Sequence, residues 1–423
     1  MLDLSVVRRQ KKQVISALEK RGIDARTLID NALVADEQRR GLQSTLDEKL
    51  ALANSLAKEI GELYKSGNPQ QASHKKVESV NLKSETKTLQ TQLAESESTL
   101  HKLLCSIPNV PNSLVPDGQS EDDNEEVFRA GEVPTLREKA LPHWELAAKY
   151  GLINFELGNK ITGAGFPVYT GKGAKLQRAL ISFFLDQNTA AGYEEVQVPH
   201  LVNEQSGFGT GQLPDKEGQM YHVGEDNLYL IPTAEVPITN LFRDEILNAN
   251  DLPITKTGYT PCFRREAGSY GSHVRGLNRL HQFDKVEIVR LEHPDKAYEA
   301  LDQMVEHVKG ILEQLELPYR ILRLCGGDLG FTSALTYDFE IYSTAQERWL
   351  EVSSVSNFES YQSTRLKLRF KDSDGNRKWV HTLNGSALAL PRIMAGLLEN
   401  HQSENGIRIP EVLVSYTGFD MIH

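Results

Sequence analysis

The stretch "CFRREAGSYGSHVRGLNRLHQFDKVEIV", residues 262–289, decides the fold of the larger part of the chain. The segments at its two ends, "YTPCFRRE" and "FDKVEIVRL", alternate as strands do, and a Gly- and Ser-rich segment separates them. The pattern predicts two antiparallel strands joined by a loop. The stretch also gathers four arginines beside three carboxylates in a chain of net charge -11. Because guanidinium groups pair bidentately with phosphate or carboxylate, we expect it to hold an anion; surface ion pairing is the alternative.

Composition narrows the class of protein. A chain of 423 residues predicts two domains. No apolar run approaches the roughly 20 residues of a membrane span, and the N-terminus turns basic too early for a signal peptide, so we expect a cytoplasmic protein without a membrane partner. Cys105, Cys262 and Cys325 lie far apart without a CxxC pair, so neither a disulfide framework nor a zinc site is expected. The acidic balance argues against indiscriminate nucleic-acid binding, so an RNA partner would need a local basic patch.

The first hundred residues show a seven-residue apolar pattern that is typical of a coiled coil. Its positions are Leu42, Leu46, Lys49, Ala53, Leu56, Ile60 and Leu63, then Leu82, Thr86, Leu89, Leu93, Ser96, Leu100 and Leu103. "KSGNPQQAS" between them reads as a turn, so we expect two helices folded back on each other, each about 30 residues and 45 Å long. We predict an N-terminal domain at 1–105 with the arm at about 28–104, a Pro- and acid-rich linker at 106–130, and a catalytic domain at 131–423.

The remainder predicts an α+β domain built on an antiparallel sheet flanked by helices. "VEIVRL" and "EVLVSY" resemble strands, and "KAYEALDQMVEHVKGILEQL" resembles a helix. "HTLNGSALALPRIMAGLLEN" reads as a Gly-Ser turn followed by a helix with Arg392 inside it, facing a charge, an aromatic ring or simply solvent. The segment at 171–203 reads as an amphipathic helix running into a strand closed by Pro199. Neither the dinucleotide-binding glycine pattern nor the P-loop occurs.

These three segments together resemble motifs one, two and three of the class II aminoacyl-tRNA synthetases. The words "IPTAEVPITN" (231–240), "PCFRREAGSYG" (261–271), "RLHQFDKVEIV" (279–289), "LEVSSVSN" (350–357) and "HTLNGSALALPR" (381–392) are similar to the signature words of bacterial-type seryl-tRNA synthetases. The coiled-coil arm fits the same family, and the similarity runs from Met1 to "PEVLVSY". The resemblance implies ATP-dependent activation of L-serine to seryl-adenylate and its transfer to serine tRNA, with selenocysteine tRNA left open as a second substrate.

For ATP, the resemblance implies that Arg264 grips the α-phosphate, where electrostatic stabilisation is needed. Glu266 would bind the adenine amino group, and Phe283 and Arg392 would sandwich the ring; Arg264, Glu266 and Arg392 are the implied catalytic residues. Arg279 would pair with the γ-phosphate, and Glu351 with Ser354 would hold Mg²⁺. Arg265 could instead have a purely structural role, and Glu351 could be an ordinary strand carboxylate. The full set of implied ATP contacts is Arg264, Arg265, Glu266, Arg279, Phe283, Glu351, Val352, Ser353, Ser354 and Arg392.

For serine, the implied binding residues are Thr233, Ala234, Glu235, Arg264, Glu287, Asn384 and Ser386. Two carboxylates beside one small substrate would repel each other unless the substrate ammonium lay between them. A pocket that hydrogen-bonds the hydroxyl rejects alanine strongly, because the analogue leaves buried polar groups unpaired. The activation step needs no general base, since the serine carboxylate is already a nucleophile, so catalysis is positioning plus charge stabilisation.

The arm supplies a local basic patch. Its outer half carries Lys49, Lys58, Lys65, Lys75, Lys76, Lys83 and Lys87 against four glutamates, a balance of 7 - 4 = +3. The resemblance implies that these lysines contact serine tRNA through its backbone and that the chain forms a homodimer; a solvated helix face is the alternative. Two other functions are the alternatives: a class II relative that loads a carrier protein but lacks the arm, and an interaction protein with an inactive catalytic domain. The retained Arg264, Glu266, Glu351 and Arg392 count against the second.

Overall fold

A computed structural model describes residues 1–135, 140–266 and 275–423. The middle of the predicted loop, 267–274, therefore lies outside the described residues. The chain divides into two compact units. The arm unit comprises Leu2–Glu19 and Ile23–Pro108, and the sheet unit comprises Met1, Lys20–Gly22 and Asn109–His423.

The arm unit is helical throughout most of its length. Its helices are α1 (Leu4–Arg9), α2 (Lys11–Glu19), α3 (Ala25–Lys65) and α4 (Pro69–Ser106). The predicted coiled-coil positions are the buried or half-buried ones, with Leu46, Leu56 and Leu93 among the buried residues of α3 and α4. The helices have 41 and 38 residues, so α3 extends about 60 Å and not the expected 45 Å. The connection is shorter than expected, because α4 already begins at Pro69, where the missing N–H of proline costs no helical hydrogen bond.

The sheet unit contains, among its described residues, an eight-stranded sheet in the order β1-β11-β12-β13-β16-β10-β9-β4. In that order the strands are Glu125–Ala130, Tyr319–Arg323, Leu335–Ser343, Arg348–Asn357, His381–Ala389, Gln282–Glu292, Ile254–Phe263 and Glu194–Glu195. Neighbours pair antiparallel except β4 and β9, which are parallel. The pair β9 and β10 confirms the antiparallel strands predicted at the two ends of 262–289. The expected linker at 106–130 ends in β1, an edge strand of this sheet.

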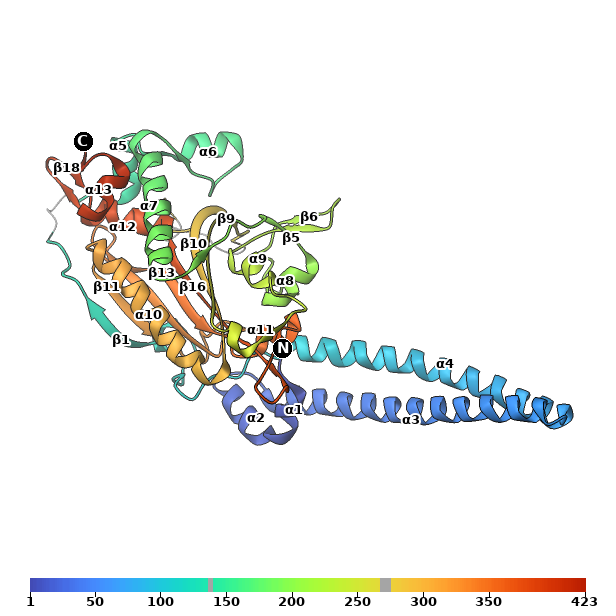
Figure 1. Cartoon of the computed structure of the whole chain (residues 1–423). Helices are drawn as coiled ribbons and strands as arrows, with labels where there is room; N and C mark the ends of the chain where they lie inside the picture. The colour runs from blue at the N-terminus through green and yellow to red at the C-terminus, as the bar shows by residue number, and fades with distance from the viewer. Residues whose placement is uncertain (136–139, 267–274) are drawn as a thin grey trace. The chain divides into compact units, whose positions relative to one another are not determined.

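Three helices pack on one face of the sheet: α7 (Gly171–Ala190), α10 (Ala297–Gln314) and α12 (Leu390–Asn400). In Figure 1, α7 and α10 lie across the near side of the strands. The core between the layers includes Phe183, Met304 and Ile393, together with Val286 and Ile288 of β10. Because side chains alternate along a strand, Phe283, Lys285 and Glu287 point to the opposite face.

The other described elements surround the sheet. They are η1 (Glu121–Asp123), α5 (His143–Lys149), β2 (Ile153–Asn154), α6 (Phe155–Ile161), β3 (Val168–Tyr169), β5 (Leu201–Asn203), α8 (Glu204–Thr210), β6 (His222–Val223), β7 (Leu228–Leu230), α9 (Glu235–Asn240), β8 (Ile246–Asn248), η2 (Ala249–Asp251), η4 (Pro294–Lys296), α11 (Tyr361–Leu366), β14 (Arg369–Lys371), β15 (Arg377–Trp379), β17 (Gln402–Ser403), β18 (Gly406–Arg408), α13 (Glu411–Thr417) and β19 (Met421–Ile422). None of the helices in the described ranges is long and apolar enough to cross a membrane.

Two local predictions were wrong. "EVLVSY" is not a strand but most of α13, which follows Pro410, carries Glu411 in its first turn and has Gly418 as its C-cap, with φ +73°. Tertiary packing decides this helix, since Leu413 is fully buried and the Tyr416 hydroxyl donates to Asp186 of α7 at 2.7 Å. The expected Gly-Ser turn in "HTLNGSALAL" lies inside β16. There Gly385 and Ser386 pair with β10. The strand continues to Ala389, and α12 begins at the next residue.

Candidate active site

The polar residues of the candidate site meet on the face of the sheet opposite α7 and α10. Residues directly opposite each other on neighbouring strands project to the same face. In β10, Lys285 lies opposite Thr260 and Glu287 lies opposite Gly258 of β9. On the other side, Glu287 lies opposite Ser386 of β16, with Asn384 two residues away. The register therefore brings together three segments that are far apart in the sequence.

The serine end of the site is defined here by Thr233, Glu235, Lys285, Glu287 and Gln362, all buried. Lys285 Nζ lies 2.6 Å from Glu287 Oε2, and the two side chains are 8% and 2% exposed. The Thr233 hydroxyl donates to the same Glu287 oxygen at 3.2 Å. Glu287 thus has a resident counter-ion, and the expected repulsion between two carboxylates is reduced from within the protein.

Glu235 is the other buried carboxylate of the serine end. It opens α9, and Gln362 Nε2 donates to its Oε1 at 2.6 Å. Burial, together with the nearby charge of Glu287, raises the pKa of Glu235 to about 7, and hydrogen bonds from Gln362 and Asn384 oppose that rise. Its charge is therefore poorly compensated near neutral pH.

Lys285 and Gln362 were missed by the sequence reasoning. Lys285 had a detectable signal, because it stands two residues before Glu287 on a strand and must share its face. Gln362 had none, because it belongs to α11, which lies outside every quoted word. Its Oε1 accepts from the Thr382 hydroxyl at 2.7 Å, so the orientation of its amide toward Glu235 is fixed.

Arg264 follows β9 and lies over the aromatic ring of Phe283, with 5.2 Å between the guanidinium carbon and the ring centroid. Its Nε donates to the Pro232 carbonyl at 3.3 Å, next to Thr233. Arg264 therefore connects the serine end to the ring on which the resemblance places adenine. Arg392, the other member of the expected sandwich, instead donates its Nη1 to the Glu351 carbonyl at 2.7 Å.

The nucleotide end is defined here by Glu266, Arg279, Glu351 and Arg392, which form two ion pairs. Arg279 Nη1 lies 2.7 Å from Glu266 Oε2, with side chains 46% and 15% exposed. Arg392 Nη1 lies 3.6 Å from Glu351 Oε2, with side chains 26% and 50% exposed. Groups expected to contact ATP thus contact each other. Arg265 lies beside this end, with its guanidinium 5.9 Å over the ring of Tyr221.

Strand β13 carries the expected magnesium ligands. The Ser354 hydroxyl donates to Asp338 Oδ1 at 2.6 Å. Burial and then the charge of Glu351 on β13 raise the pKa of Asp338 on β12, so this carboxyl holds its proton more tightly than usual. No group of three or more His, Cys, Asp or Glu side chains suited to a metal occurs among the described residues.

The two residues between Glu351 and Ser354 direct their side chains elsewhere. Val352 packs in the core with Phe339. The Ser353 hydroxyl donates to the Ser386 carbonyl at 2.5 Å. Because both side chains are engaged in this way, a contact of Val352 or Ser353 with ATP would come from the main chain. That contact stays a prediction.

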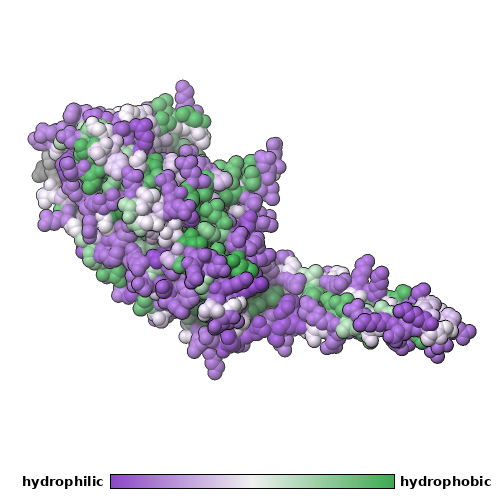
Figure 2. Space-filling model, in the orientation of Figure 1, coloured by the Kyte–Doolittle hydropathy of each residue, from purple (hydrophilic) through white to green (hydrophobic). Residues whose placement is uncertain are grey.

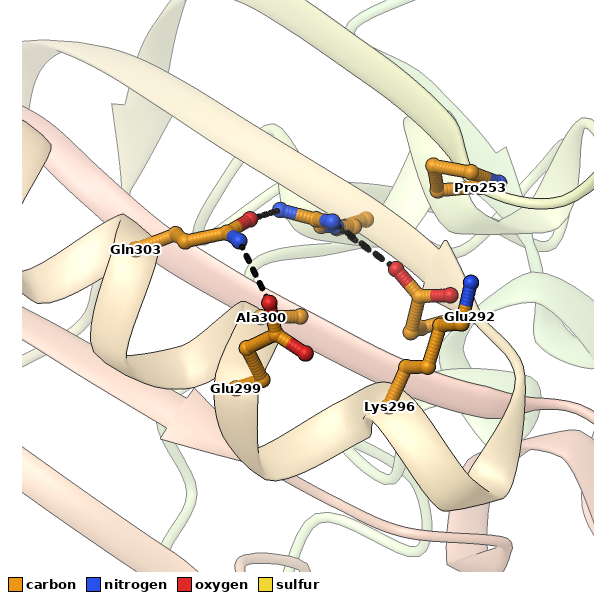
Figure 3. A pocket seen from close by; sticks show the side chains of 7 residues that line it. Pro253, Glu292, Lys296, Glu299, Ala300 and Gln303 are labelled. Atoms are coloured by element: carbon orange, nitrogen blue, oxygen red, sulfur yellow. Dashed lines mark hydrogen bonds and ion pairs between the residues drawn. The ribbon is translucent and has the colours of Figure 1, made fainter.

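A hollow of roughly 200 Å³ on the sheet unit does not belong to this site (Figure 3). Within the hollow, Arg290 donates to Glu292 at 3.0 Å and to Gln303 at 2.8 Å, so these three polar side chains pair with one another. Side chains alternate between the two faces of a strand, so Arg290 and Glu292 lie on the face of β10 opposite to Glu287. They therefore face α10 and not the site. The hollow is lined by Pro253, Arg290, Glu292, Lys296, Glu299, Ala300 and Gln303.

Comparison with known proteins agrees with this geometry. Residues 1–111 match the family model "Seryl-tRNA synthetase N-terminal domain", and residues 220–401 match "tRNA synthetase class II core domain (G, H, P, S and T)". The chain is 49% identical over 424 residues to the serine–tRNA ligase of Salinibacter ruber, covering 100% of this chain and 99% of the relative. The chain belongs to the seryl-tRNA synthetase family. The serine–tRNA ligase of Akkermansia muciniphila is 46% identical, again over 100% of this chain and 99% of the relative.

Solved structures of the seryl-tRNA synthetase family agree over the whole chain. The seryl-tRNA synthetase of Pyrococcus horikoshii complexed with ATP has a TM-score of 0.92 at 32% identity, covering 100% of this chain and 99% of that one. The predicted fold class and the predicted enzyme class, a serine–tRNA ligase that activates serine with ATP, are therefore confirmed. The carrier-protein alternative loses its support, because the match includes the N-terminal domain that such a relative would lack.

Proposed function

We propose that serine binds with its ammonium beside Glu235. The observation that carries this is the ion pair of Lys285 and Glu287 at 2.6 Å, which leaves Glu235 as the carboxylate in need of a cation. The serine hydroxyl then faces Glu287 and Ser386, which lie opposite each other on β10 and β16. Ala234 and Asn384 complete this wall of the pocket. An amino acid without the hydroxyl would leave these buried polar groups unpaired.

ATP binds beside Arg264, with adenine on Phe283 and Glu266 at its amino group. A serine carboxylate oxygen attacks the α-phosphorus, the bond to the β-phosphate oxygen breaks, and pyrophosphate leaves with the electron pair. Arg264 stabilises the charge that grows on the α-phosphate. Arg279 exchanges Glu266 for the γ-phosphate, since guanidinium groups pair with phosphate as well as with carboxylate. Arg392 exchanges Glu351 for the adenine ring, on the side opposite Phe283.

Mg²⁺ fits the acidic edge formed by Glu351 and Asp338. Mg²⁺ takes one or two carboxylates plus substrate phosphates and water, so a two-residue contribution from Glu351 and Ser354 suffices. Bound there, it would neutralise pyrophosphate charge. The surroundings of Asp338 support this: burial and then the charge of Glu351 raise its pKa, and a bound cation would offset that charge.

The arm lysines are proposed to contact the backbone of serine tRNA. Figure 2 shows a mostly hydrophilic surface along the arm. Lys49 and Lys75 pair across the arm with Glu85 at 2.8 Å and Glu59 at 2.6 Å. Lys58, Lys65, Lys83 and Lys87 are exposed, so they are the stronger candidates. Lys76 is exposed as well, but its ammonium lies 5.6 Å from the ring centroid of Tyr64. A homodimer, a cytoplasmic location and any use of selenocysteine tRNA also stay proposals; sedimentation at the mass of one chain would contradict the dimer.

The test is ATP–pyrophosphate exchange with each of the twenty amino acids, followed by charging of a serine tRNA transcript. We expect exchange with serine alone. Exchange with glycine or alanine would support the carrier-protein alternative, and no exchange at all would make the arm the working part. A Lys58→Gln, Lys83→Gln, Lys87→Gln variant should raise the KM for tRNA several-fold without changing exchange, whereas Lys49→Gln serves as the matched control.

A further inference from the structure

We propose that a buried pair, His143 and Glu399, positions the two arginines of the nucleotide end. Both side chains are 0% exposed, and neither takes part in the chemistry proposed above. His143 opens α5 and Glu399 lies near the end of α12, so the pair joins two helices. The inference rests on the proposed roles of Arg279 and Arg392 in ATP binding.

The hydrogen bonds of His143 fix both its tautomer and the main chain in front of it. The backbone N–H of Leu277 donates to His143 Nε2 at 2.8 Å, so Nε2 carries the lone pair. Nδ1 must then carry the proton and donate to Glu399 Oε1, 2.7 Å away. Gly276 allows the close approach: its φ is +70°, and a Cβ there would lie 2.2 Å from His143 Nε2.

Glu399 closes a circuit through the turn between β12 and β13. Gln346 Nε2 donates to Glu399 Oε1 at 2.9 Å, and Gln346 Oε1 accepts from Asn278 Nδ2 at 2.9 Å. The Ser343 hydroxyl donates to the second oxygen of Glu399. Residues 277 and 278 are therefore held twice, at a main-chain N–H and at a side chain.

The held segment touches both arginines. The Asn278 carbonyl accepts from Arg392 Nε at 3.0 Å, and Arg279 is the next residue along the chain. Arg392 also lies on α12, the helix that carries Glu399. Among the residues that the structure describes, no hydrogen bond of this circuit reaches Glu235, Glu287 or Lys285. A positioning role thus predicts an effect on ATP and not on serine, whereas a merely structural role would affect both substrates or stability alone.

The test compares two substitutions in the full-length protein by pyrophosphate exchange. His143→Asn retains a donor toward Glu399 and loses the acceptor for Leu277, whereas His143→Gln can retain that acceptor. We expect His143→Asn to raise the KM for ATP about five- to tenfold, the size expected for one hydrogen bond, with the KM for serine within twofold. His143→Gln should restore most of the ATP affinity. The matched control is His307→Asn, which removes the hydrogen bond between the His307 ring on α10 and Asn188 on α7.

Equal changes in both KM values, or identical Asn and Gln variants, would overturn the inference. If His143→Asn fails to fold, Gln346→Ala at the half-buried turn removes the link between Asn278 and Glu399 and should raise only the KM for ATP, about two- to fivefold. An unchanged KM for ATP in that variant would also overturn the inference. The unsubstituted protein separates the two hypotheses: no serine-dependent exchange there contradicts the proposed function, whereas normal exchange with unaffected variants contradicts the positioning role alone.

Discussion

The two ends of the candidate active site differ in how their charges are held. At the serine end, Lys285 and Glu287 form an ion pair whose side chains are 8% and 2% exposed. At the nucleotide end, Arg279 is 46% exposed and its partner Glu266 is 15% exposed. A buried polar pocket discriminates strongly, because a wrong substrate leaves desolvated groups unpaired. An exposed pair is weak and exchangeable, which suits the binding and release of a polyanion.

The largest test of this difference is a substitution of Arg264, which lies between the two ends. Arg264→Ala should leave the fold intact and lower the rate of serine activation about 10²- to 10³-fold, as expected for one lost electrostatic donor at the reacting phosphate. Steady-state pyrophosphate exchange measures this, and circular dichroism checks the fold. Arg408→Ala, which removes a surface pair with Glu316, serves as the control. Near-normal exchange in Arg264→Ala would place the phosphate grip elsewhere.

The sequence predicted local features well and long-range partners poorly. Apolar periodicity located the arm, and strand alternation placed Glu287 and Ser386 near each other once the register was known. Gln362 and His143 could not be found this way. They act on Glu235 and Leu277, residues 127 and 134 positions away, and no local period records such contacts. The helix at "EVLVSY" failed for the same reason, because Leu413 and Tyr416 gain their partners from tertiary packing that overrides β propensity.

The comparison sharpens through the pH dependence of serine binding. The pKa of Glu235 is about 7, so below that pH the carboxyl takes up a proton and loses its attraction for the serine ammonium. Serine keeps its own positive charge throughout this range, because an α-ammonium group loses its proton only at higher pH. The KM for serine should therefore rise about fivefold between pH 7 and pH 6, because the ionised fraction of Glu235 falls by that factor, whereas the KM for ATP should not follow this titration.

A Glu235→Gln variant is the matched control for this pH effect. It preserves the shape of the side chain and removes its titration, so its KM for serine should be higher at pH 8 but nearly independent of pH. Parallel pH profiles in the variant and the unsubstituted protein would show that another group binds the ammonium.

The smallest effect is expected at the exposed nucleotide end. Arg279→Ala should raise the KM for ATP about fivefold at 50 mM salt, since a half-exposed guanidinium contributes on the order of 1 kcal/mol. At 300 mM salt this effect should shrink, because exposed charges are screened within several ångströms. The loss in Arg264→Ala should change little over the same range, because its guanidinium is partly covered by Phe283. If both variants respond equally to salt, then Arg264 is as well solvated as Arg279, and the difference in burial between the two ends does not govern how they bind charge.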